Sequence, residues 1–186
     1  MGKHLRYFMT YDFSQLSSLD FEEICRDLLQ EEMGERLETF KPGRDQGIDI
    51  RLLLGKKKTY MQCKHYIKSG LPTLLSKIKN EEADKVKNLK PDRYVFCTSL
   101  PLSASDKTKI KEILSPFIRY DSDIFGQEDL NNLLNRHKKI ETQHFKLWLS
   151  STAVLERVLH NAVLTRSESL VDRVKRKLPL FVPNAS

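Results

Sequence analysis

The chain has 186 residues, of which 39% are hydrophobic and 31% charged, and its formal net charge is +7. This length accommodates one domain with a substantial core and an appendage, and the composition excludes a disordered or membrane-embedded protein. No apolar stretch approaches the roughly 20 residues of a membrane span, and the N-terminus lacks a signal-peptide core, so we expect a cytoplasmic protein without a membrane partner.

The positive charge is concentrated near the C-terminus. Residues 136–186 contain 10 Lys and Arg against 4 Asp and Glu, whereas the preceding part is nearly balanced. This distribution is compatible with nucleic-acid binding, and equally with a solvated surface. Three widely spaced cysteines, Cys25, Cys63 and Cys97, match neither a disulfide framework nor a zinc site, and we expect buried thiols in a reducing compartment.

The first part of the chain is predicted to form an irregular arm, one helix and three strands. A serine pair at 17–18 supplies an N-cap, and apolar residues then recur at helical spacing until residue 34. Residues 35–40 indicate a first strand. Residues 48–53 alternate with the period of a strand, and residues 59–65 run back antiparallel to form a hairpin.

The remaining elements indicate an α/β fold. We expect a helix over 71–89, a strand over 93–99, a helix over 106–114 capped by Ser103 or Ser105, a short strand over 117–120 and a helix over 127–135. The strand over 93–99 is continuously apolar, so it should be central and covered on both faces. The order predicts an α/β sandwich around a central mixed sheet.

A change of character follows this predicted sandwich. Residues 140–164 are periodic and predict a long helix, and residues 167–178 predict a second, basic helix. We therefore divide the chain into a domain over 1–136 and a helical connector over 137–186. The connector is too apolar for a flexible linker, and we expect it to lead toward a further region outside this chain.

The hairpin carries the candidate chemistry. Asp49 lies on its first strand, and strand pairing can bring it beside Gln62 and Lys64, which share one face because they are two residues apart. Phosphodiester hydrolysis needs a metal ion that offsets phosphate charge and activates water. Asp49 is the predicted primary ligand of Mg²⁺ (Mn²⁺ as a possible substitute), with the Cys63 backbone carbonyl as a second ligand while the Cys63 side chain points into the core.

Three neighbouring side chains have candidate roles in the same site. Lys64 would position or deprotonate the attacking water and offset charge in the transition state. The Gln62 amide oxygen would ligate metal or orient water. Glu22, at the border of the apolar face of the first helix, would reach a metal-bound water, while Glu23 should face solvent; the alternative is that both are surface acids near a helix N-terminus.

Other residues near the hairpin have an open interpretation. Asp45 would either contact and orient the metal ligands or form a turn next to Gly47. His65 should lie on the opposite face from Lys64 and pack there. Three lysines at the hairpin tip would contact a DNA backbone or simply face water: Lys56, Lys57 and Lys58.

These motifs together resemble the Mrr-type branch of the PD-(D/E)XK restriction-endonuclease-like nucleases. The resemblance rests on Glu22, on the segment 43–49 with its two aspartates, and on Gln62-Cys63-Lys64, where Gln replaces the usual acid. Segments 94–99 and 124–130 resemble later parts of that branch. The resemblance implies a restriction-endonuclease-like fold over roughly residues 17–135, and with one acid fewer the site would hold one metal ion rather than two.

The whole chain also resembles the N-terminal nuclease region of STAND NTPases of the AVAST antiphage defence type. This resemblance implies an effector that cleaves double-stranded DNA once a phage protein binds a sensor region and the assembly oligomerises, with a tetramer as one form. No G-x-x-x-x-G-K-[ST] motif occurs in the chain, so NTPase and sensor regions would lie elsewhere.

The sequence therefore leads to three functional hypotheses. The first is a magnesium-dependent endodeoxyribonuclease. The second is a catalytically inactive nuclease-like module for DNA binding or assembly, against which the presence of Glu22, Asp49 and Lys64 argues. The third is a structure-specific junction resolvase.

Overall fold

The structure is a computed structural model that describes residues 10–39, 50–54, 57–66 and 69–149, together with 163, 166, 167 and 169. The chain divides into two compact units, Met1–Leu147 and Trp148–Ser186. The sheet and nearly all described helices belong to the first unit. The functional boundary expected after residue 136 stays a prediction. Among the described residues, no helix is long and apolar enough to cross a membrane.

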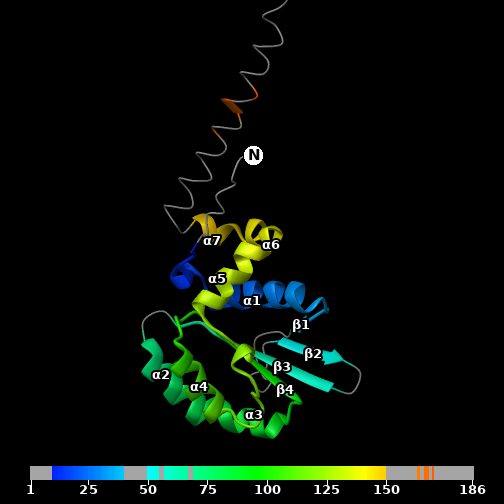
Figure 1. The fold of residues 1–186 in the computed structure, drawn as a ribbon, viewed down its shortest axis with the longest axis vertical. Coiled ribbons are helices and arrows are strands. Elements are labelled where there is room, and N and C mark those ends of the chain that lie inside the picture. The colour runs from blue at the N-terminus through cyan, green and yellow to red at the C-terminus, as the bar shows by residue number, and fades with distance from the viewer. Residues whose placement is uncertain are drawn as a thin grey trace, which may run out of the picture. The chain divides into compact units, whose positions relative to one another are not determined.

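A five-stranded mixed sheet in the order β1-β2-β3-β4-β5 forms the centre of the first unit (Figure 1). β1 (Glu38–Thr39), β2 (Ile50–Leu54) and β3 (Lys57–Lys64) are antiparallel neighbours. β4 (Arg93–Thr98) and β5 (Ile124–Phe125) continue the sheet in parallel. The mixed sheet confirms the predicted fold class.

One side of the sheet is covered by α1 (Ser18–Met33), with α5 (Gln127–Arg136) beside it (Figure 1). Ser17 and Asp20 form a capping box at the start of α1, which satisfies two backbone amides that the helix leaves open. Gly34 ends the helix with a φ of +65°, a conformation that glycine adopts at little cost. The predicted first helix is confirmed.

The other side is covered by α2 (Gly70–Lys77), the π-helical turn η2 (Ile78–Glu82), α3 (Ala83–Leu89) and α4 (Ala104–Ile113) (Figure 1). The first three follow one another without a break, so the single helix expected over 71–89 contains a wide turn. Ser103 caps α4 through a capping box with Asp106.

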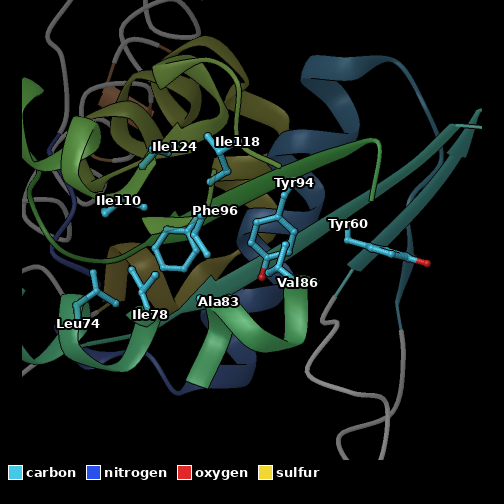
Figure 2. Packing of buried hydrophobic residues seen from close by; sticks show 11 residues of the cluster. Tyr60, Leu74, Ile78, Ala83, Val86, Tyr94, Phe96, Ile110, Ile118 and Ile124 are labelled. Carbon is cyan, nitrogen blue, oxygen red and sulfur yellow. The ribbon is translucent and has the colours of Figure 1, made fainter. Parts of the chain in front are cut away.

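The core between these helices and the sheet is apolar on both sides. Figure 2 shows side chains from α2, η2, α3 and α4 packed against those of β3 and β4. The buried residues of this core are Tyr60, Leu74, Ile78, Ala83, Val86, Tyr94, Phe96, Ile110, Leu114, Ile118 and Ile124. Tyr94 to Thr98 are buried throughout, as expected for a central strand with both faces covered.

Two expected elements differ from the structure. Residues 117–120 form no strand; the last strand is instead β5, after the short helix η3 (Asp121–Asp123). The backbone of Phe117 nevertheless accepts a hydrogen bond from the Tyr94 amide. The long helix expected from residue 140 is interrupted at His144, between α6 (Lys138–Gln143) and α7 (Phe145–Leu149).

The N-terminal arm is fixed to α5 by a buried side chain. The Asn131 side chain accepts from the Tyr11 amide at 2.6 Å and donates to the Tyr11 carbonyl at 3.1 Å. The Tyr11 hydroxyl donates to Glu141 on α6. The short helix η1 (Phe13–Gln15) follows, with Phe13 buried. Residues 1–9 of the expected arm lie outside the described residues.

We expect Asn131→Ala to lower the free energy of unfolding by about 1–3 kcal/mol, because it removes two hydrogen bonds to the buried backbone of Tyr11. Asn132→Ala is the matched control, since Asn132 is the exposed neighbour on the same helix, and its effect should stay within about 0.5 kcal/mol. Urea denaturation measures both. Equal effects of the two substitutions would contradict the fixing role of Asn131.

Ion pairs connect α1 to the helices near residue 140. His144 contacts Asp27 at 2.8 Å, and His137 contacts Glu32 at 2.8 Å. Burial alone would raise the pKa of Asp27, but hydrogen bonds from His144 and Arg26 outweigh it and hold that pKa below its usual value. The hydrogen bond from His137 likewise lowers the pKa of Glu32.

These lowered pKa values predict acid destabilisation. A carboxyl group whose pKa is lower in the folded than in the unfolded state stabilises the fold above its unfolded pKa, near pH 4, and loses that contribution as the pH falls through its folded pKa. The free energy of unfolding should therefore decline below about pH 4, and less steeply in Asp27→Asn. Denaturation curves across this range test it; identical declines would refute the Asp27 contribution.

Candidate functional site

The two faces of β3 contact different layers of the fold. Tyr60 belongs to the core under α2 and α3, and Lys64, four residues on, contacts Glu82 of η2. Gln62 lies between them on the same face because side chains alternate along a strand. The opposite face carries Cys63 and His65, which contact α1. The predicted sharing of one face by Gln62 and Lys64 thus places both toward η2.

Lys64 makes the central charged contact of this face. Its Nζ lies 2.8 Å from Oε1 of Glu82, and its side chain is 25% exposed whereas that of Glu82 is 1% exposed. Lys85 Nζ approaches the same oxygen at 3.1 Å from the next turn of the helix. The Lys64 ammonium group thus meets a buried carboxylate, while part of the Lys64 side chain stays exposed to solvent.

The backbone around Lys64 is fixed to β4. The Ser99 amide donates to the Lys64 carbonyl at 3.3 Å. The Ser99 hydroxyl donates to the carbonyl of Tyr66 at 3.0 Å and accepts from its amide at 2.9 Å. These bonds continue the parallel ladder in which Lys64 pairs with Thr98, so the end of β3 has one defined register.

Gln62 is buried, with 3% of its surface exposed. It pairs in the ladder with Phe96 of β4. A buried amide supplies both an acceptor and donors without the desolvation cost of a charge. Gln62 is therefore a neutral polar side chain on the buried face of β3, and Lys64 lies at the edge of the same face.

The Cys63 side chain points away from this face, as expected from the sequence. Its sulfur lies within 4.8 Å of those of Cys25 on α1 and Cys97 on β4, and all three are free and buried. The wide spacing of the cysteines gave no indication of this cluster. Burial raises the pKa of the Cys25 thiol well above its ordinary value. The three buried cysteines therefore serve as packing groups between α1 and the sheet.

The Cys63 carbonyl has a direction set by the ladder. Successive carbonyls of a strand point to opposite edges. The Lys64 carbonyl bonds to Ser99 on the β4 side, so that of Cys63 points to the β2 side. On that side Ile50, the first described residue of β2, pairs with Met61.

His65 packs on α1, which confirms that it faces away from Lys64. Its ring stacks on Phe21 with centroids 5.0 Å apart, and its Nε2 lies 2.9 Å from the Leu16 carbonyl oxygen. Both partners flank the start of α1. The first turn of that helix is therefore adjacent to the end of β3.

Glu22 follows Phe21, just after the first turn of α1, and is half-buried. Its neighbour Glu23 is also half-buried and lines a hollow between α1 and α7, so the two acids belong to the same burial class. The position of Phe21 against His65 brings the Glu22 backbone near the end of β3.

Several predicted site residues lie outside the described residues: Asp45, Asp49 and Lys56. Their roles stay predictions. Lys57 and Lys58 are exposed at the start of β3, as expected, and the Lys58 amide is fixed by the Asp92 carboxylate at 2.8 Å.

Glu82 is the site residue that the motif reasoning missed. A signal was present, because Glu82 lies four residues after Ile78 and four before Val86, both fully buried. An acid in the middle of an apolar helix stripe requires a buried cationic partner. Lys64 is that partner.

Comparison with known proteins agrees with this geometry. Residues 13–99 match the Mrr_cat family, described as restriction endonuclease. The match indicates a restriction-endonuclease-like nuclease domain over these residues. The matched range includes all of β1 to β4 and Glu82.

A longer relative is also similar. The uncharacterized protein y4cD of Sinorhizobium fredii is 44% identical over 155 residues, which cover 83% of this chain and 24% of that protein. The chain thus spans about a quarter of the length of the relative it matches. No solved structure matches the chain significantly.

We expect the three cysteines to resist thiol reagents in the folded protein. Thiolates, not thiols, are the reactive form; all three sulfurs are buried, and burial raises the pKa of the Cys25 thiol. With dithiobis(nitrobenzoate), the native chain should release almost no thionitrobenzoate within minutes, and the denatured chain should release three equivalents. Rapid reaction of one thiol in the native chain would contradict the neutral packing role.

Proposed function

We propose that this chain is a metal-dependent endonuclease domain that hydrolyses phosphodiester bonds in double-stranded DNA. The single observation that carries the proposal is one face of β3. On this face Gln62 is buried, and the Lys64 ammonium group is held beside it by an ion pair at the edge of the face. The family match over residues 13–99 supports the same reaction.

The donor atoms of the proposed site suit a hard cation. The sulfur of Cys63 is turned into the cluster with Cys25 and Cys97, so oxygen donors remain: the Cys63 carbonyl, the Gln62 amide and the Asp49 carboxylate. Mg²⁺ prefers such donors and Mn²⁺ substitutes for it. A bound ion would offset charge on the scissile phosphate and activate water.

The register of the hairpin supports the role of Asp49. Ile50 pairs with Met61, and these two residues adjoin Asp49 and Gln62 in the sequence. We propose Asp49 as the primary ligand, Glu22 as a partner of metal-bound water and Asp45 as a supporting residue. Lys57 and Lys58, together with Lys56, would contact the DNA backbone, which attracts cations regardless of sequence.

In the cell we propose an effector nuclease of a cytoplasmic antiphage defence protein of the AVAST type. Its activation would follow recognition of a phage protein by regions outside this chain and assembly into a homo-oligomer, for example a tetramer. The segment that aligns with this chain makes up only 24% of protein y4cD, which is in keeping with such a modular arrangement.

We expect Asp49→Ala and Lys64→Ala each to reduce DNA cleavage at least about 100-fold, because each removes a charge that acts on the reacting phosphate. Asp84→Ala and Lys139→Ala are matched controls that remove exposed charges of the same kind, and they should cleave like the wild type. Plasmid nicking and linearisation over a wide range of protein concentration measure the effect. Retained metal-dependent cleavage in Asp49→Ala would refute the assigned site, whereas a wild-type chain that binds DNA but never cuts it with Mg²⁺ or Mn²⁺ would favour DNA binding or assembly without cleavage.

Removal of divalent ions should abolish cleavage without unfolding the chain, because the described core is held together by apolar packing. We expect EDTA to stop plasmid cleavage, added Mg²⁺ or Mn²⁺ to restore it, and the circular dichroism melting curve to stay unchanged. Cleavage that persists in excess EDTA would contradict a metal-dependent reaction.

A further inference from the structure

Lys77 on α2 is an exposed lysine outside the hairpin motif. Its Nζ lies 5.6 Å from the centroid of the Tyr66 ring, which is a cation–π contact between α2 and the segment after β3. We propose that the Lys77 ammonium group, held over this ring, binds a phosphate of the DNA backbone beside the proposed site. This inference deepens the proposed function and rests on it.

Tyr66 lies just beyond the end of β3 that carries Lys64. It is two residues after Lys64, which corresponds to at most about 7 Å of chain. The Ser99 hydroxyl bonds to both the amide and the carbonyl of Tyr66, so the backbone there has a fixed position. The Tyr66 ring packs against the core under α2, on the side of the sheet where Lys64 meets η2. Lys77 therefore borders the face that carries the proposed site.

The exposed lysines of the hairpin are farther from this face. Lys57 and Lys58 lie at the start of β3, and Lys58 is six residues before Lys64. At about 3.3 Å per residue this separation is about 20 Å, or about six base pairs at a rise of about 3.4 Å. Lys77 is thus better placed than the hairpin tip to contact a phosphate next to the reacting one.

The charge of Lys77 is not offset by a carboxylate of the described part of the chain. Other lysines of the same helical layer form ion pairs with acids of the fold, as in Lys87–Asp84, Lys109–Asp106 and Lys111–Asp121. Within the described residues Lys77 forms no ion pair, and its partner is an uncharged ring. An aromatic face attracts a cation but leaves its net charge in place. Lys77 therefore keeps a full positive charge for an external anion.

The ring also restricts a long and otherwise mobile side chain. A lysine loses rotamer freedom when it binds an anion, and a side chain already confined over a ring loses less of it. A phosphate contact positions DNA without reading a base edge. The Lys77 contact should therefore add affinity for duplexes of any sequence.

Fluorescence anisotropy of a labelled DNA duplex, with EDTA present to prevent cleavage, tests the contact. Lys77→Ala should bind at least about threefold more weakly, and its slope of log affinity against log salt should be smaller by about 0.9, the value of one phosphate contact. Lys77→Arg keeps the charge and stacks on the ring, so it should bind like the wild type. Lys87→Ala is the matched control, because it removes an exposed lysine of the same helical run that pairs with Asp84.

Variants of Tyr66 separate the ring from the charge. Tyr66→Leu removes the ring but no charge, so it should weaken binding while the salt slope stays that of the wild type. Tyr66→Phe keeps the aromatic face and should bind like the wild type. Two duplexes of unrelated sequence should respond alike to each variant. Unfolding curves of every variant check that a lost affinity does not come from a lost fold.

Three results would count against the inference. Wild-type affinity and salt slope in Lys77→Ala would overturn it. An equal loss in Lys87→Ala would also overturn it, because the effect would then be one of net charge alone. Unchanged binding by Tyr66→Leu would overturn the part of the ring.

Plasmid cleavage with Mg²⁺ then separates this inference from the proposed function. Lys77→Ala should raise KM and leave kcat near the wild-type value, because a contact beside the reacting phosphate binds substrate and transition state alike. A loss confined to kcat would overturn the binding role. A wild-type chain that never cuts DNA would overturn the proposed nuclease activity, while the anisotropy results would still decide whether Lys77 binds the backbone.

Discussion

The described fold depends on the pairing and packing of β3. This strand pairs antiparallel with β2 on one edge and parallel with β4 on the other, and each of its faces packs on a different helical layer. A shift of one residue in its register would exchange the two faces. The cysteine cluster would then meet the helix layer that holds Glu82, and Lys64 would turn toward α1. The apolar packing of β3 therefore fixes the direction of its polar side chains.

The two faces of β3 hold their side chains in place through different kinds of interaction. On the α1 side, Cys63 makes packing contacts and His65 stacks on an aromatic ring. On the η2 side, Lys64 meets a buried charge. Dispersion contacts act only at close range and from every side, whereas the attraction within an ion pair joins two particular groups and, when one partner is lost, leaves the other buried charge uncompensated. The first kind of contact holds the strand, and the second orients one side chain.

Much of this architecture could be predicted from the sequence, where local signals are strong. The capping box at Ser17, the apolar stripe of α1 and the continuous apolar run of β4 each have one physical interpretation. The alternation around Cys63 likewise gave the correct faces for Gln62, Lys64 and His65. Local patterns were weaker for two-residue strands, so β5 was expected several residues too early, in a segment where the Phe117 carbonyl accepts a hydrogen bond from the Tyr94 amide of β4.

The contact of Lys64 with Glu82 could not be predicted in the same way, because it depends on the helix geometry. The partners are 18 positions apart, and the wide turn η2 that aligns Glu82 with the apolar stripe has no simple sequence signature. A regular helix drawn through residues 71–89 rotates the later positions away from the earlier ones. The cysteine cluster was missed for a related reason, since three distant segments meet only once the sheet has formed.

The neutral residue at position 62 and the acid at position 82 are physically linked. Gln62 is only 3% exposed, so a carboxylate in its place would be a second buried negative charge on the same face. It would compete with Glu82 for Lys64, which is the cationic side chain that β3 contributes to this face. Desolvation would favour protonation of one of the two acids. An amide at position 62 avoids this competition, keeps an oxygen donor on the strand and leaves the Lys64–Glu82 pair electrically balanced.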